Sequence, residues 1–143
     1  MSNDQPARVH LDANVILRYI LKDDPKQSPI AAAIFNRSQT TEIRLLVSAI
    51  ILSEVFYVLT RTRGMSRLEA AKLLLALIST RFVHCSDNVV VVTDALRRIG
   101  AKNVSFGDAY LAALAVHQGE PVASFDHHLA GFQDVEIYKP KTS

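Results

Sequence analysis

The chain has 143 residues, of which 49% are hydrophobic and 21% charged, so it can bury the core of one ordinary domain and is not a disordered tail. Its single cysteine, Cys85, excludes an intramolecular disulfide framework and a cysteine zinc cluster. The formal net charge of +2 permits a polyanionic partner but does not require one. Since residues 1–8 are polar and no apolar stretch is long enough to span a bilayer, we expect a cytoplasmic protein.

Short apolar segments alternate with longer helical patterns along the chain. The predicted strands cover residues 8–12, 44–48, 82–85, 121–125 and 135–138. The predicted helices cover residues 13–21, 29–38, 49–63, 66–79, 87–99 and 105–118. A valine run leaves a strand possible in the fifth of these helices. The alternation predicts an α/β fold, an α/β/α sandwich with a central parallel sheet, and we expect residues 1–143 to form a single domain.

Four acids occupy positions that are unfavourable for an unpaired carboxylate. Asp12 and Asp126 each end a predicted strand, at the carboxyl edge where open parallel sheets bind ligands. Glu54 has apolar residues three and four positions before and after it in a predicted helix, so we expect it to lie in an apolar stripe. Asp108 lies in the first turn of its helix.

A group of carboxylates suggests metal chemistry. Like charges held together raise one another's pKa unless a cation intervenes. All-oxygen groups suit hard divalent ions such as magnesium or manganese. Such ions lower the pKa of bound water and stabilise in-line displacement at phosphorus. If the fold brings them together, the four acids therefore predict a metal site.

Each acid also has a simpler explanation. Asp12 and Asp126 are candidate helix N-caps, and Asp108 can complete a capping box with Ser105. Glu54 lies too far inside its helix to be a cap, so its alternative is a solvent-facing or salt-bridged acid. Both explanations stay open, because the sequence alone does not show which residues converge in space.

Four blocks of the sequence together resemble the motifs of a known protein family: LDANVILRYILKDDPKQ, LSEVFYVLTR, VSFGDAYLAALAVHQG and VASFDHHL. In this order they resemble the PIN domain, in particular VapC-like toxins of bacterial toxin–antitoxin pairs. The resemblance implies a parallel sheet between helices and a magnesium- or manganese-dependent endoribonuclease that cleaves RNA. It also implies a homodimer and a cognate antitoxin protein. The segment after Gly131 matches little of the pattern.

The resemblance also implies roles for particular residues. The family's acidic site, both catalytic and metal-binding, maps onto Asp12, Glu54, Asp108 and Asp126. Its polar supporters map onto Asn14 and Ser124.

Two other functions remain open at this stage. The first is a non-cleaving PIN-like module that binds RNA or a protein, which metal-dependent cleavage by the purified protein would exclude. The second is a phosphoaspartate receiver-like domain, which also gathers acids at strand ends. A receiver needs a lysine on a late strand, and the late strands PVASF and VEIY contain none.

Several basic and histidine side chains have less specific patterns. Five cations are candidate phosphate contacts or ordinary solvated side chains: Arg18, Lys22, Arg61, Arg63 and Arg67. We expect His127 and His128 to be surface histidines, because no second pair of His or Cys supports a zinc site. Cys85 is expected in the core, because no partner base can be assigned to it.

The helix predicted over residues 49–63 carries a second apolar stripe, made of Leu52, Val55, Phe56 and Leu59. Burial inside the domain, under the helix of residues 66–79, would explain it. We predict instead that the stripe lies at a homodimer interface, because soluble monomers rarely expose several large apolar side chains together.

Overall fold

Three short segments pair as the central sheet of this computed structural model, which describes residues 5–40 and 42–140. The strands are β1 (Ala7–His10), β2 (Ile43–Val47) and β3 (Val83–Cys85), paired in parallel in the order β1-β2-β3. Leu45 of the middle strand lies opposite both Val9 and Val83. The last three residues of β2 are buried, as expected of a central parallel strand covered on both faces.

Helices account for most of the remaining chain and flank the sheet. They are α1 (Ala13–Leu21), α2 (Gln27–Gln39), α3 (Ala49–Tyr57), the π-helix η1 (Val58–Thr62), α4 (Arg67–Ser79), α5 (Val89–Ala101), α6 (Phe106–Gln118) and α7 (His127–Ala130). The parallel sheet between helices confirms the α/β/α sandwich. The valine run forms helix α5, which excludes the strand alternative.

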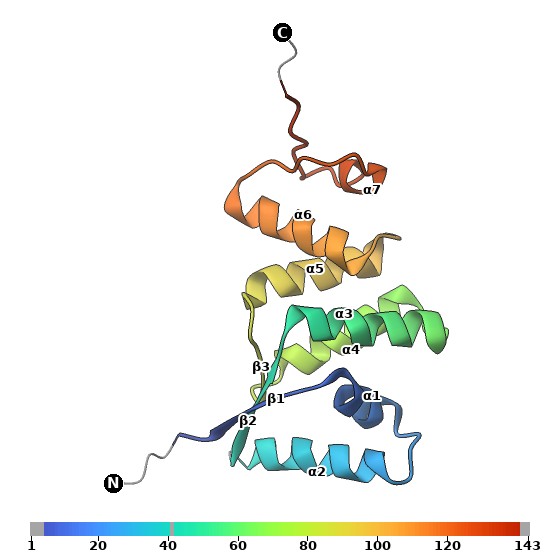
Figure 1. Ribbon diagram of the computed structural model, residues 1–143, viewed down its shortest axis with the longest axis vertical. Helices are drawn as coiled ribbons and strands as arrows, with labels where there is room; N and C mark the ends of the chain where they lie inside the picture. Colours follow the sequence, from blue (N-terminus) through green and yellow to red (C-terminus); the bar gives the residue numbers. More distant parts are fainter. Residues whose placement is uncertain (1–4, 41, 141–143) are drawn as a thin grey trace.

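The helices form a stack that extends beyond the sheet. Helix α2 packs against β2, α4 packs against β3, and α5 lies between α4 and α6. Figure 1 shows α2 and α7 at opposite ends of the molecule. No helix in the described part of the chain combines the length and apolar character that a membrane crossing needs.

The two late strands differ from the prediction. In place of strands over residues 121–125 and 135–138, the described chain forms an isolated parallel bridge between Val122 and Ile137. Val122 is buried, whereas its neighbours Pro121 and Ala123 are exposed. A single buried residue does not give this segment the apolar face that would hold it in a sheet.

The prediction of an interface along the second stripe of α3 and η1 is wrong. The four side chains of that stripe are at most 5% exposed within the single chain, and they are Leu52, Val55, Phe56 and Leu59. Helices α1 and α4 both pack against α3 and cover this face. The stripe therefore belongs to the core of the domain.

Glu54 lies on the opposite face of α3, and the prediction that it lies in an apolar stripe facing inward is wrong. Ile50 and Tyr57, one turn before and after Glu54, are 71% and 61% exposed. Glu54 is itself exposed, so it does not lie in an inward apolar stripe. The helix has apolar residues on nearly every side, so spacing alone could not identify the buried face.

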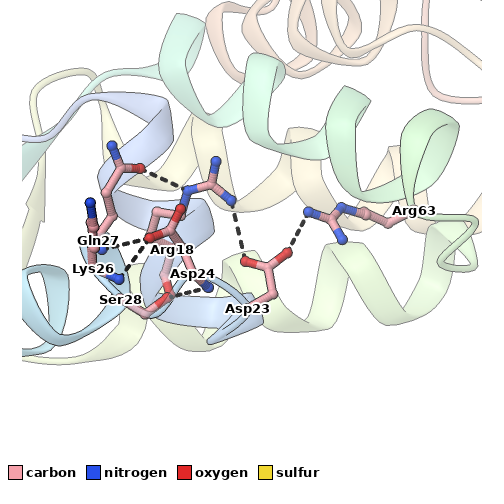
Figure 2. A network of polar contacts seen from close by, with 7 residues as sticks. All are labelled: Arg18, Asp23, Asp24, Lys26, Gln27, Ser28 and Arg63. Atoms are coloured by element: carbon pink, nitrogen blue, oxygen red, sulfur yellow. Dashed lines mark hydrogen bonds and ion pairs between the residues drawn. The ribbon is translucent and has the colours of Figure 1, made fainter.

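Polar contacts fasten the turn after α1 to the end of η1. Asp23 accepts hydrogen bonds from Arg18 Nη1 at 3.2 Å and from Arg63 Nη2 at 2.5 Å, one on each carboxylate oxygen. Arg18 Nε also donates to Gln27 Oε1 at 3.0 Å, and Figure 2 shows Asp23 between the two arginines. Asp24 accepts from the backbone N–H groups of Lys26 and Gln27, at the start of α2. We call Arg18, Asp23 and Arg63 the Asp23 clamp.

Candidate active site

Two of the four predicted acids lie together with a histidine. Asp108, Asp126 and His128 each offer one ligand atom, and these atoms lie within 4.8 Å of one another. Asp108 comes from the first turn of α6, whereas Asp126 and His128 come from the start of α7. The described structure thus joins side chains from two helices in one possible metal site.

Short local hydrogen bonds orient this site. Ser105 caps α6 and accepts from the backbone N–H of Asp108 at 3.0 Å. Ser124 accepts from the backbone N–H of Asp126 at 2.9 Å. Asp126 Oδ1 in turn caps α7 by accepting from the backbone N–H of His128 at 2.8 Å. Because a carboxylate has two oxygens, a cap on one leaves the other free for a ligand.

Asp12 and Glu54 lie outside this group in the described structure. Asp12 follows β1 and caps α1, with its Oδ1 accepting from the backbone N–H of Ala13 at 2.8 Å. The capping explanation therefore holds for Asp12 and Asp126, as does the Ser105 cap beside Asp108. Convergence of all four acids stays a prediction.

Two further polar side chains lie near the strand ends. Asn14 is exposed and lines a groove between α1 and α2 with Arg18 and Gln27. Asp87 follows β3, and its Oδ2 accepts from the backbone N–H of Ala49 at 2.6 Å. Asp87 thus helps to cap α3, a structural role that the sequence did not indicate.

A groove of about 470 Å³ opens beside Asp108. It lies between the end of α3, η1, the start of α4, the start of α6 and α7. Its polar lining includes Tyr57, Arg61, Asn103, Asp108 and His128. The candidate metal ligands therefore adjoin a cleft that contains cationic and aromatic side chains.

The structure separates the cations that the sequence could not distinguish. Arg18 and Arg63 are bound in the Asp23 clamp. Arg67 lines the groove, but its guanidinium donates to the backbone carbonyls of Ile99, Lys102 and Val104. Burial and the positive charge of Arg61 lower the pKa of Arg67.

His128 is the member of the site that sequence reasoning missed. It is exposed, as expected for a surface histidine, but its Nδ1 lies 3.1 Å from Asp126 Oδ1. The available signal was its position two residues after a candidate ligand. Its proximity to Asp108 could not be inferred from the sequence, because it depends on how α6 and α7 pack.

The donor set fits a divalent metal ion. Two carboxylates and one imidazole can bind divalent first-row metals, and carboxylate oxygens also suit magnesium. The sequence model of the PIN domain family matches residues 9–135. The chain belongs to the PIN domain family. PIN domains are typically metal-dependent nucleases, in agreement with these donors.

The matched region of this PIN domain begins within β1 and includes β2, β3 and all four predicted acids. A comparison with curated proteins found no match. Family membership therefore establishes the fold, and metal-dependent nuclease chemistry is typical of the family; the activity, substrate and partners of this chain are matters for proposal.

Proposed function

We propose that this PIN domain is a magnesium- or manganese-dependent endoribonuclease that cleaves RNA phosphodiesters. The observation that carries the proposal is the proximity of Asp108, Asp126 and His128 at the edge of a groove with a cationic lining. Asp12 and Glu54 are proposed as the other acids of the site, on the strength of the sequence blocks that contain them.

Each part of the site has a role in this proposal. A divalent ion held by Asp108, Asp126 and His128 would supply Lewis-acid stabilisation of charge at phosphorus and favour ionisation of water. Ser105 and Ser124 hold the backbone of the two aspartates, so these ligands are oriented before a substrate arrives. The groove admits the RNA strand next to them.

Cleavage of a labelled RNA by the purified protein tests this proposal. We expect cleavage with magnesium or manganese and none with EDTA. Asp108→Asn should lower the rate by at least about 100-fold, because it removes a ligand charge while an amide is tolerated in the first helical turn. Glu120→Gln is the matched control, since Glu120 is an exposed acid just beyond the other end of α6. Cleavage that persists in EDTA, or an Asp108→Asn protein with the wild-type rate, would contradict the proposal.

A second function has one observation in its favour. Asp12 and Glu54 do not join the ligand group in the described chain, as expected of a PIN module that binds RNA without cutting it. Binding of RNA by the wild type without cleavage in either metal would favour this module.

We also propose that the protein is the toxin component of a type II toxin–antitoxin system, acts in the cytoplasm and forms a homodimer. The support is the VapC-like order of the four sequence blocks. Expression alone should stop bacterial growth, and expression with the cognate antitoxin should restore it. Light scattering over a dilution series should give twice the monomer mass. Normal growth under expression would count against the toxin role, and a constant monomer mass would count against the homodimer.

A further inference from the structure

The groove beside Asp108 carries an aromatic side chain that the metal site does not use. Tyr57 ends α3, lines the groove and is 61% exposed. The guanidinium carbon of Arg61 lies 5.9 Å from the centre of the Tyr57 ring. An exposed ring beside a cation offers a stacking surface and a positive charge at one place.

The charges in the groove are unbalanced. Arg61 and Arg67 lie close enough for the charge of Arg61 to lower the pKa of Arg67, after the larger effect of burial. Arg67 is engaged by three backbone carbonyls, whereas Arg61 forms no ion pair with any residue of the described chain. Asp108 is the acid that the described residues contribute to the lining. Two neighbouring guanidiniums without an acid between them favour binding of an anion.

The positions of Tyr57 and Arg61 along the helix connect them to the candidate active site. Tyr57 lies three residues after Glu54 and four before Arg61, so the three side chains follow one exposed face. The π-helical segment η1 contributes Arg61 to that face. Asp108 and His128 line the same groove from α6 and α7.

We propose that Tyr57 and Arg61 form a nucleotide-binding subsite, in which an unpaired RNA base stacks on Tyr57 and Arg61 binds the adjoining phosphate. This inference rests on the proposed function and names residues that would select and hold the substrate. The base must be unpaired, because a base inside a duplex cannot offer its face to a protein ring. The subsite therefore binds its substrate as a single strand and does not bind a duplex in this way.

The test measures binding apart from cleavage. A short fluorescein-labelled single-stranded RNA is titrated with protein in EDTA, and fluorescence anisotropy is recorded at several salt concentrations. Arg61→Gln should weaken binding about tenfold and reduce the slope of log affinity against log salt by about 0.7. Tyr57→Leu should weaken it about 5- to 100-fold, whereas Tyr57→Phe, which keeps the ring, should stay within about twofold of the wild type.

Arg37→Gln is the charge-matched control, because Arg37 is an exposed arginine on α2, where it pairs with Glu42, and Figure 1 shows α2 and α7 at opposite ends of the molecule. It removes the same charge and should leave affinity within about twofold. A labelled duplex of the same sequence should bind more weakly than the single strand, and Tyr57→Leu should not affect it. Circular dichroism and urea unfolding establish that each variant is folded.

The outcomes separate this inference from the proposed function. If Arg61→Gln and Tyr57→Leu bind as the wild type does, the subsite is overturned, even where the wild type cleaves RNA. If both variants lose affinity and the wild type fails to cleave, the subsite stands and the nuclease proposal fails. If the wild type binds no single-stranded RNA in EDTA, the subsite is overturned, and the cleavage assay with metal decides the nuclease proposal separately.

Discussion

Two regions of the molecule use arginines from the same short segment in opposite ways. Arg63 lies just beyond η1 and is paired with Asp23, which Arg18 also contacts (Figure 2). Arg61 lies two residues earlier, against the ring of Tyr57 in the groove. In the Asp23 clamp each cation has a carboxylate partner. In the groove the two guanidiniums have no carboxylate between them among the described residues.

This difference indicates which charges serve the fold and which are available to a ligand. A paired charge has already satisfied its hydrogen bonds and loses them if it turns to a substrate. An unpaired exposed charge loses only water when an anion arrives. We therefore expect changes in the clamp to affect stability and changes at Arg61 to affect binding.

The largest effect on stability is expected at Arg67, which lines the groove but is bonded like a structural residue. Arg67→Ala removes the donor to three backbone carbonyls at the junction of α5 and α6. Its free energy of unfolding should fall by about 2 kcal/mol, since hydrogen bonds to charged groups contribute more than neutral ones. Arg61→Ala should change it by less than about 0.5 kcal/mol. Urea unfolding measures both, and equal losses would remove the distinction between the two arginines.

A smaller effect is expected at the centre of the clamp. Asp23→Asn removes both ion pairs and leaves Arg18 and Arg63 facing one another. We expect a lower melting temperature by calorimetry, with a difference from the wild type that shrinks in high salt, because these charges are accessible to solvent. RNA affinity in EDTA should be unchanged. A loss of affinity as large as that of Arg61→Gln would show that the clamp also binds substrate.

The next effect on stability depends on pH and concerns the ion pair between Arg98 and Asp134. Arg98 donates two hydrogen bonds to Asp134 and holds the pKa of that carboxyl below its ordinary value of 3.8, against a smaller desolvation effect. Because the folded-state pKa is lowered, the contribution to stability is complete above pH 3.8 and is lost as the pH falls through the folded-state pKa.

Replacing Asp134 tests this pH dependence. Asp134→Asn should be less stable than the wild type at neutral pH, and the difference should narrow in acid below pH 3.8. Urea midpoints over a pH series measure this. A difference that stays constant through the acid range would mean that the ion pair contributes nothing to stability.

The smallest effect on function is expected from replacing Cys85, whose thiol is partly shielded from solvent. Desolvation, and then the negative charge of Asp87, raise the pKa of the Cys85 thiol. The thiol should therefore stay protonated at neutral pH and react with Ellman's reagent at least about tenfold more slowly in the native protein than in urea. Cys85→Ser should keep RNA affinity and cleavage. Rapid labelling of the native protein would assign Cys85 a reactive role.

Local signals account for the parts of the fold that the sequence predicted. The apolar β2 segment, the serine caps at Ser66 and Ser105 and the glycine after α6 each act within a few residues. Gly119 ends α6 with φ of +68°, a conformation that glycine adopts without strain. The positions of Asp12 and Asp126 beside helix starts were equally readable. Whether a capping carboxylate also binds metal was not, because the same residue type suits both roles.

By itself, the sequence predicted the first three strands, most of the helices and the parallel sheet, because these depend on short-range periodicity and composition. It also singled out Asp108 and Asp126, whereas the convergence of Asp12 and Glu54 with them stays a prediction. Only the tertiary structure decided that Glu54 faces solvent and that His128 joins Asp108 and Asp126. It also placed Arg61 in the groove and Arg63 in the clamp. The physical reason is that these outcomes depend on contacts between helices distant in the chain. An almost wholly apolar α3 can turn several faces inward, and its packing against α1 and α4 selects one.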